Sequence, residues 1–314
     1  MDALEKVAGA ARFTADLHRP GMTFAVIVRS PAPAGRLTAI DAAAALALPG
    51  VRALLSLDDV HGIRVDGGQL LDDTIRYAGQ PLCVVCAETL GAARAAAAAV
   101  NLFIERAAHA VTAGQALAEG APKLRSRGNV SPRSPRIIQR GDVDAGLREA
   151  EVTITREYRT PVALHTALEP HGAVAEWEGN RLTVWESTQG IFNTRRDLAA
   201  AFKLKLTDVR VMKDYMGGGF GAKNGASAAA YIAAALSRKV GRPVRCVFDR
   251  YGEQIDTGNR SATAQRVTLG ARRDGTLTAI RMDATIPLGV GGWEAGPGRI
   301  YHELHACPNV RTSE

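Results

Sequence analysis

A run of glycines at residues 217–221 is the segment with the clearest capacity to bind a ligand. Four of its five residues are glycine, and it lies between a predicted strand at 209–212 and an alanine-rich predicted helix at 226–240. Without Cβ atoms, this backbone can adopt positive φ and come close to a ligand. The first N–H groups of the following helix also favour an anion. The segment predicts a bound phosphate or pyrophosphate; the alternative is a tight turn that only lets helix and strand pack closely.

Two known kinds of phosphate loop bear on the identity of the ligand. A Walker loop ends in Gly-Lys-Ser/Thr, whereas this loop ends in Ala222-Lys223-Asn224 and lacks both the glycine and the hydroxyl that binds Mg²⁺. The dinucleotide fingerprint G-x-G-x-x-G/A fits better, with Gly217, Gly219 and Ala222 in place. Asp249 also follows the next predicted strand. An NAD-binding Rossmann-type oxidoreductase therefore stays open, although the residues before the loop are more polar than a Rossmann strand.

Cysteine and histidine pairs offer two further kinds of chemistry. Cys83 and Cys86 form a C-x-x-C pair, but they lie in the apolar stretch 79–87. That stretch predicts a buried strand, in which free cysteine behaves as a small hydrophobic side chain. His165 and His171 could bind a metal, but no third ligand accompanies them in the sequence. Both are therefore predicted to be structural histidines that make hydrogen bonds.

Several segments together carry a resemblance to one protein family. Glu-Pro-His at 169–171 and Ser-Thr-Gln at 187–189 precede the loop Gly-Gly-Gly-Phe-Gly-x-Lys at 217–223. A segment at 2–21 and Thr-Gly-Asn-Arg at 257–260 complete the pattern. In this order they resemble the molybdenum-binding subunits of the xanthine dehydrogenase/aldehyde oxidase family. The resemblance spans essentially the whole chain.

The resemblance implies a cofactor in which a pyranopterin carries a molybdenum ion, either as molybdopterin or as its cytosine dinucleotide form. Gln189 matches the family glutamine that hydrogen-bonds a molybdenum ligand, and its amide N–H suits an oxo group. Phe220 and Gly221 match loop residues whose backbone approaches the metal centre. No residue of this chain is expected to bind the metal directly, because the pterin dithiolene holds it. The implied cofactor-binding residues are Gln189, Gly218, Gly219, Phe220, Gly221 and Ala222.

Two more residues are implied for a substrate pocket. Asn224 stands where some purine-oxidising relatives have a substrate-binding glutamate, and its amide carries no charge. The resemblance therefore argues against a purine substrate. Arg299 corresponds to a substrate-pocket arginine of the family.

The resemblance also implies an activity and partners. The family oxidises an aldehyde or an N-heterocycle with oxygen derived from water, and a glutamate acts as general base. That glutamate is expected beyond residue 314, so no catalytic residue is assigned here. We therefore expect a second molybdopterin-binding chain that supplies it. We also expect an iron–sulfur subunit, because no cysteine spacing here suits an iron–sulfur cluster, and in some assemblies an FAD subunit. The alternatives are an inactive fragment and a non-catalytic assembly protein of the same fold.

Short alternating strands and helices predict an α+β fold. By the resemblance, residues 1–115 form an a/b hammerhead-like domain and residues 139–314 the first half of a molybdopterin-binding α/β domain. Residues 116–138 are basic and rich in Pro, Ser and Gly, and they are predicted to be a linker. Strict alternation of apolar and polar residues at 152–158 predicts a half-buried strand.

Charge and hydropathy exclude other classes. Six bases and no acid lie between residues 122 and 140, which leaves +1 of the net charge of +7 for the rest of the chain. Such a run is typical of a solvated connector rather than a nucleic-acid surface. No stretch reaches the roughly 18 apolar residues of a membrane span, and the first residues do not resemble a secretory signal. We expect a cytoplasmic protein that acts on a small molecule, and a periplasmic one only if a partner's signal carries it.

Overall fold

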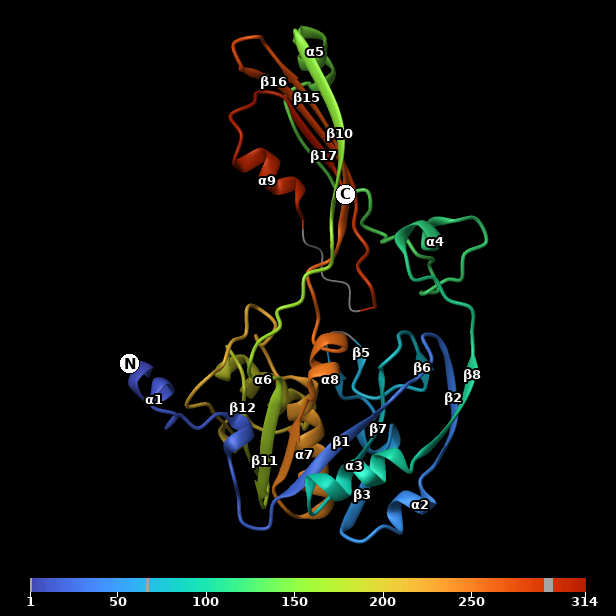
Figure 1. Cartoon of the computed structure of the whole chain (residues 1–314), viewed down its shortest axis with the longest axis vertical. Coiled ribbons are helices and arrows are strands. Elements are labelled where there is room, and N and C mark those ends of the chain that lie inside the picture. Colours follow the sequence, from blue (N-terminus) through green and yellow to red (C-terminus); the bar gives the residue numbers. More distant parts are fainter. Residues whose placement is uncertain (1, 66–67, 291–295) are drawn as a thin grey trace. The chain divides into compact units, whose positions relative to one another are not determined.

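The computed structural model describes residues 2–65, 68–290 and 296–314. The chain forms two compact units, each built from two separate stretches of sequence (Figure 1). The first unit contains the residues up to Ala108 together with His165–Gly258, and the second contains His109–Leu164 and Asn259–Glu314. This is a division by packing, and the sequence domains proposed above stay a prediction beside it.

A seven-stranded mixed sheet forms the centre of the first unit. Its fourth and fifth strands pair in parallel, with Thr23 opposite Val244, so the N-terminal stretch and the later stretch share one sheet. The strands, in spatial order, are β13 (Val209–Met212), β12 (Arg181–Glu186), β11 (Gly172–Glu178), β14 (Val244–Val247), β1 (Thr23–Arg29), β7 (Pro81–Ala87) and β3 (Val51–Leu55).

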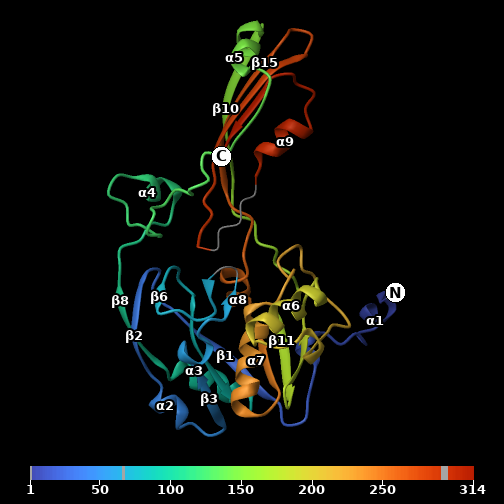
Figure 2. The same cartoon turned by 180° about the vertical axis from the view of Figure 1, so that it is seen from behind.

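Helices cover both faces of this sheet. On one face α7 (Ala228–Val240) lies along β11 (Figure 2), and its many alanines allow close packing. On the other face α3 (Leu90–Ala98) packs against β1 and β7, and α2 (Ala43–Leu46) packs against α3. Each face of the sheet has its own apolar core, one shared with α7 and one shared with α3. Successive side chains of β7 point alternately into these two cores, which explains why this strand is apolar and buried throughout.

Smaller elements complete the first unit. A three-stranded sheet contains β6 (Thr74–Ile75), β2 (Gly35–Asp41) and β8 (Asn101–Arg106), and a short ladder joins β4 (Arg64–Val65) to β5 (Gly68–Gln69). The other helices here are α1 (Ala3–Val7), α6 (Ile191–Ala201) and α8 (Arg250–Ile255), with 3₁₀ turns at Thr14–Asp16, Asp58–Val60 and Leu206–Asp208.

The second unit is built on a five-stranded sheet. Its strands, in spatial order, are β10 (Val152–Thr160), β15 (Thr263–Ala271), β16 (Leu277–Thr285), β17 (Val310–Ser313) and β9 (Ile137–Arg140). Its helices are α4 (Ala113–Leu117), α5 (Val143–Glu149) and α9 (Gly298–Glu303). The side chain of Asp142 caps α5 by accepting a hydrogen bond from Ala145 N–H. A small apolar core forms around Ile280, Cys307 and Val310.

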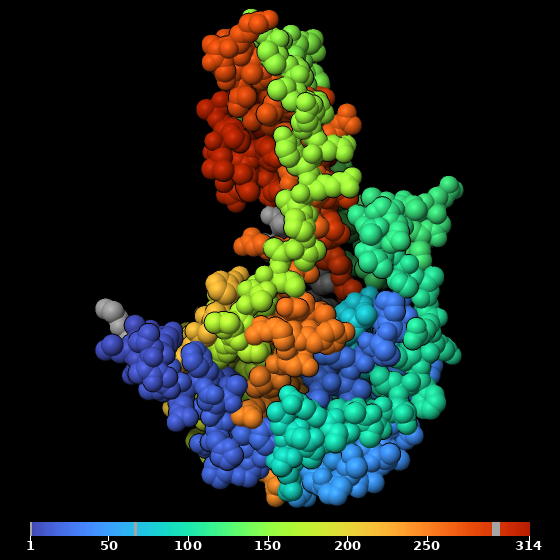
Figure 3. Space-filling model, in the orientation of Figure 1, coloured from blue at the N-terminus to red at the C-terminus, as the bar shows by residue number. Residues whose placement is uncertain are grey.

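The basic segment 116–138 and the strand predicted at 152–158 differ in part from expectation. Residues 118–136 of the predicted basic linker 116–138 contain neither helix nor strand, but residues 116–117 belong to α4 and residues 137–138 to β9. The strand predicted at 152–158 exists as β10, whereas its half-burial is wrong. It is an edge strand that pairs only with β15, and nearly all its residues are exposed, including Ile154 and Tyr158 (Figure 3, yellow-green).

No helix among the described residues is long and apolar enough to cross a bilayer.

The buried cysteines give a first testable prediction. Cys83 and Cys86 are free thiols inside β7, as predicted, and burial raises the pKa of Cys83 to about 12. Since the thiolate is the reactive form, we expect native protein to incorporate well under one iodoacetamide per chain at pH 8. All four thiols of the chain should react once the protein is unfolded in guanidinium chloride. Stoichiometric labelling of Cys83 in the native state, read by mass spectrometry, would contradict the buried strand.

Candidate functional site

The predicted cofactor-binding residues gather at one end of the seven-stranded sheet. Strand β11 is antiparallel to both β12 and β14, and β12 is parallel to β13. The start of β11 therefore lies beside the ends of β12, β13 and β14. Four connecting segments meet there: the Glu-Pro-His segment before β11, the Ser-Thr-Gln segment after β12, the glycine loop after β13, and α8 after β14.

The glycine loop adopts a backbone that depends on its sequence. Gly218 and Gly221 have φ of 106° and 92°, values that favour glycine, and Phe220 is also left-handed at 49°. Gly219 packs directly on Gln189: a Cβ at this position would lie 2.6 Å from Gln189 Oε1. The side chain of Phe220 is 70% exposed. The loop thus presents backbone, rather than side chains, on the side of Gln189.

Gln189 is oriented by the loop. Its Oε1 accepts hydrogen bonds from the backbone N–H groups of Gly221 at 2.9 Å and Lys223 at 3.3 Å. An oxygen that accepts two N–H groups must be the carbonyl of the amide, so the orientation of this side chain is fixed by chemistry. The side-chain NH₂ is then the outward group, on an exposed residue. It offers a donor to whatever binds beside the loop.

The middle of the loop carries N–H groups that the protein does not use. Within the described ranges, the backbone N–H groups of Gly218, Gly219 and Phe220 have no acceptor. Gly219 is nevertheless buried, and buried N–H groups seldom lack a partner. Three adjacent donors beside the NH₂ of Gln189 make a site for an oxygen-rich anionic group.

The helix after the loop begins at Ala228, and the two N–H groups just before it have protein acceptors. Ala226 N–H donates to Asp197 at 3.2 Å and Ser227 N–H donates to Glu186 at 2.7 Å. Both carboxyl groups come from other segments of the chain, which the sequence did not indicate. That the first N–H groups of α7 itself favour an anion stays a prediction.

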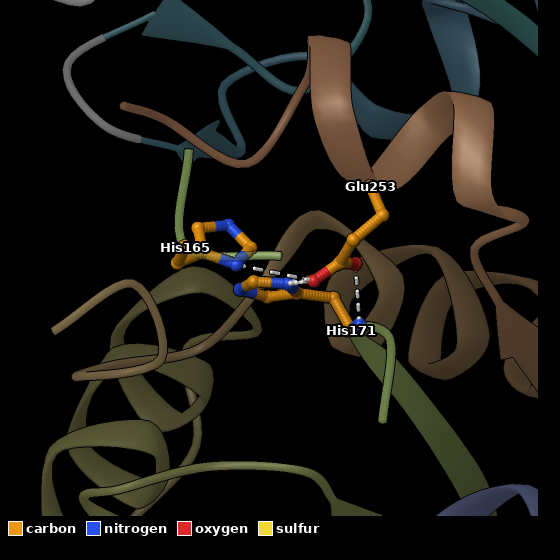
Figure 4. Close-up of side chains that lie close together, drawn as sticks. All are labelled: His165, His171 and Glu253. Carbon is orange, nitrogen blue, oxygen red and sulfur yellow. Dashed lines mark hydrogen bonds and ion pairs between the residues drawn. The ribbon is translucent and has the colours of Figure 1, made fainter. Parts of the chain in front are cut away.

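His165 and His171 make hydrogen bonds, as predicted. His165 Nε2 lies 2.8 Å from the hydroxyl of Thr257, and His171 contacts Glu253 and the carbonyl of Ala222. The expectation that no third potential ligand accompanies them is wrong, because Glu253 of α8 lies beside both rings (Figure 4). Its Oε1 is 3.7 Å from His165 Nδ1 and 2.9 Å from His171 Nδ1. Its separation of 82 residues from His171 hides it from any local motif.

The two predicted substrate-pocket residues belong to different units. Asn224 is exposed at the end of the loop, and its Nδ2 donates to Gly221 O at 2.9 Å. Arg299 lies on α9 in the second unit, where it pairs with Glu303 on the same helix. Their roles toward a substrate stay a prediction.

The Rossmann alternative is wrong. A dinucleotide-binding loop follows a central strand of a parallel sheet, whereas β13 lies at the edge of the main sheet and the sheet is mixed. Asp249 does not face the loop as a ribose ligand would. It caps α8, where its Oδ1 accepts from Gly252 N–H at 2.7 Å.

Glu186 is the least expected residue near the loop. Its side chain is buried, Oε1 accepts from Ser227 N–H, and Oε2 has no partner among the described residues. Burial raises the pKa of Glu186 to about 7 from an ordinary value of 4.5. The folded state therefore binds this proton more tightly than the unfolded state.

This shift predicts a pH-dependent stability. Because the pKa of Glu186 is higher in the folded state, binding of its proton stabilises the folded state. This stabilisation is complete below pH 4.5 and is lost as pH rises through about 7. Relative to the wild type, Glu186→Gln should gain roughly 3 kcal/mol of unfolding free energy between pH 4 and pH 8. Chemical unfolding across that range measures it. Glu178→Gln, at an exposed carboxylate of the same hairpin, is the control, and an identical profile for both variants would refute the shift.

Comparison with known families agrees with this geometry. Residues 129–310 match the family described as the molybdopterin cofactor-binding domain. Residues 8–106 match the family described as the aldehyde oxidase and xanthine dehydrogenase a/b hammerhead domain. The predicted fold class, a hammerhead-like part followed by a molybdopterin-binding part, is thereby confirmed.

Two curated relatives illustrate the range of similarity. The aldehyde oxidoreductase molybdenum-binding subunit PaoC of Escherichia coli K12 is 36% identical over 290 residues, which cover 89% of this chain and 38% of PaoC. The nicotinate dehydrogenase large molybdopterin subunit of Eubacterium barkeri is 30% identical over 99% of this chain and 75% of that subunit.

Solved structures share the fold. The chain matches CO dehydrogenase from Oligotropha carboxidovorans with a TM-score of 0.88 and 24% identity over 100% of this chain and 43% of the other. Quinoline 2-oxidoreductase from Pseudomonas putida 86 matches with a TM-score of 0.89 and 24% identity, over 99% and 43%. With the two family matches and these relatives in agreement, the chain belongs to the xanthine dehydrogenase/aldehyde oxidase family of molybdenum-binding subunits.

Proposed function

We propose that this chain binds a molybdenum-bearing pyranopterin through the glycine loop and Gln189, as part of a molybdenum hydroxylase. The observation that carries the proposal is the set of three unused N–H groups at residues 218–220, one of them on a buried residue, beside the outward NH₂ of Gln189. N–H donors suit the oxygens of a phosphate or an oxo ligand. The fit is to the cofactor's oxygens, because these donors cannot ligate a metal.

Each loop residue has a proposed part. The N–H groups of Gly218, Gly219 and Phe220 would hold anionic oxygens of the cofactor, and the NH₂ of Gln189 would donate to a further oxygen of the bound group. Gly221 keeps Gln189 in place through its N–H, and Ala222 holds the end of the loop through its carbonyl contact to His171. When bound, the cofactor supplies two-electron oxidation of the substrate with oxygen from water.

The proposed substrate is an aldehyde or an N-heterocycle. Support comes from the names of the relatives, one an aldehyde oxidoreductase subunit and one a nicotinate dehydrogenase subunit. Asn224 presents an uncharged amide at the end of the loop, which suits an aldehyde better than a purine held by a carboxylate. Arg299 stays a candidate for the same pocket.

The complete activity is proposed for an assembly rather than for these 314 residues. The chain spans 38% of the length of PaoC, and the general base is expected outside it. We propose a second molybdopterin-binding chain together with iron–sulfur and FAD subunits in the cytoplasm, and the cytosine dinucleotide as one form of the cofactor. The nicotinate dehydrogenase subunit, 75% of which this chain covers, is itself named as one subunit.

Purification of the complex tests the proposal. The chain is expressed with a tag in its own host, isolated with its partners, and analysed for molybdenum and for the fluorescent oxidation product of pterin. We expect about one molybdenum and one pterin per chain, and reduction of a dye by an aromatic aldehyde but not by hypoxanthine. A folded complex without molybdenum and pterin would refute the enzyme function and favour an assembly protein.

Gln189→Glu isolates the proposed donor. The carboxylate retains an oxygen for the N–H groups of Gly221 and Lys223 but replaces the outward NH₂ by an acceptor. In the complex, turnover of the aldehyde should fall by roughly a hundred-fold, as for loss of a donor at a developing negative charge, while the melting temperature stays within a few degrees. Gln139→Glu, at an exposed position of the second unit, is the matched control. Equal turnover of the two variants would remove Gln189 from the site.

Gly219→Ala tests the close approach of loop and glutamine. The added Cβ would overlap the side chain of Gln189 at 2.6–2.7 Å, so either the loop or Gln189 must move. We expect a several-fold loss of bound pterin with a destabilisation of about 1–3 kcal/mol. Gly114→Ala is the control, because its Cβ would meet its nearest neighbour only at 4.0 Å. Full pterin content in Gly219→Ala would show that the loop does not hold the cofactor.

A further inference from the structure

The segment Glu169-Pro170-His171 contacts both ends of the glycine loop, a role that the proposed function does not yet include. At the start of the loop, Glu169 Oε2 accepts from Gly217 N–H at 2.7 Å, and Glu169 N–H donates to Gly217 O at 3.3 Å. The approach is so close that a Cβ on Gly217 would lie 2.6 Å from Glu169 Cβ. Glycine is therefore required at this position for packing.

The end of the loop is held by the same segment. The fully buried Lys223 donates through Nζ to Glu169 O at 2.6 Å and to the hydroxyl of Ser187 at 2.7 Å. His171 Nε2 lies 3.2 Å from the carbonyl oxygen of Ala222. Two residues of one tripeptide thus bind the first, the sixth and the seventh residue of loop 217–223.

Both ring nitrogens of His171 have polar partners. Nδ1 lies 2.9 and 3.1 Å from the two oxygens of Glu253, and Nε2 lies 3.2 Å from the carbonyl oxygen of Ala222. Glu253 also accepts a hydrogen bond from the backbone N–H of His171 at 2.7 Å. Although burial acts to raise the pKa of Glu253, the hydrogen bonds and charge of His171 hold that pKa below its ordinary value.

A metal ion between His165, His171 and Glu253 is the competing interpretation. The three offer ligand atoms within 4.8 Å of one another. However, the cations Lys223 and Arg250 face the same cluster, and both act electrostatically on His165. Two nearby positive charges oppose a divalent cation, whereas the Nδ1–carboxylate contact at 2.9 Å is an ordinary charged hydrogen bond.

We propose that Glu169 and His171 are positioning residues that fix the two ends of the glycine loop, and that the contact with Glu253 holds His171 in place. Their direct effect is on the loop itself. Their effect on cofactor binding rests on the proposed function, because it requires that residues 218–220 hold the cofactor.

Hydrogen exchange of the full chain, with any partner that copurifies, tests the proposal without reference to activity. Glu169→Ala and His171→Ala should each accelerate exchange in peptides covering residues 215–226 by about ten-fold or more, as expected when hydrogen bonds to charged groups are lost. Peptides from α7 serve as the internal reference and should keep their protection. Glu169→Gln retains an acceptor for Gly217 N–H and should rescue part of the loss.

His165→Ala is the matched control, because His165 is the other histidine of the cluster and bonds Thr257 rather than the loop. Its loop exchange should stay within about two-fold of the wild type. The proposal is overturned if His165→Ala accelerates hydrogen exchange of the loop as much as His171→Ala does, or if His171→Ala leaves that exchange unchanged.

Histidine-selective ¹⁵N NMR of the wild type provides a measurement that does not depend on a variant folding. We expect a ring N–H signal of His171 that exchanges slowly with solvent, as for a buried nitrogen that bonds Glu253. A rapidly exchanging ring N–H, or stoichiometric zinc by elemental analysis that is lost in both histidine variants, would overturn the pairing with Glu253. If the variants change hydrogen exchange of the loop as expected but the complex contains no pterin, the proposed function alone is refuted. If His171→Ala and His165→Ala bind equal amounts of pterin and loop exchange is unchanged, the positioning role alone is refuted.

Discussion

The site depends on how the backbone N–H groups between residues 217 and 227 are divided among acceptors. Carboxylates of the protein take those at the two ends, Glu169 at Gly217 and Glu186 at Ser227, and Gln189 takes two from the loop. Within loop 217–223, the N–H groups of residues 218–220 have no acceptor among the described residues. Leaving a buried donor unpaired costs about 1–3 kcal/mol, so the flanking bonds must hold this backbone in a conformation that it would not keep alone.

The groups that hold it are charged and buried, which is unusual in so small a region. Lys223, Glu253 and His171 are each almost fully inaccessible. Burying such groups is costly unless their hydrogen bonds are complete, and here nearly every polar atom has a partner. Glu186 Oε2 and the hydroxyl of Ser227 are exceptions, and burial raises the pKa of Glu186. The arrangement favours a defined geometry more than it favours stability.

Much of the fold could be predicted from the sequence, because local patterns determine local elements. The strand at 209–212, the loop after it and the helix that follows were all foreseeable from apolar periodicity and glycine content. The carboxyl groups that accept from Ala226 and Ser227, and the carboxylate of Glu253 beside the two histidines, were not, because they come from distant segments. The exposure of β10 was also hidden, since alternation of apolar and polar residues does not tell whether another layer covers the strand.

The parallel pair of β1 and β14 has a consequence for how the protein is made. Thr23 N–H bonds to a carbonyl at Pro243, about 220 residues further along the chain. A ribosome working from the N-terminus releases β1 well before β14 exists, so the central sheet stays open on that side while the residues between them are made. Closure of the sheet therefore waits for β14, and until then the edge of β1 is exposed to pairing with other chains.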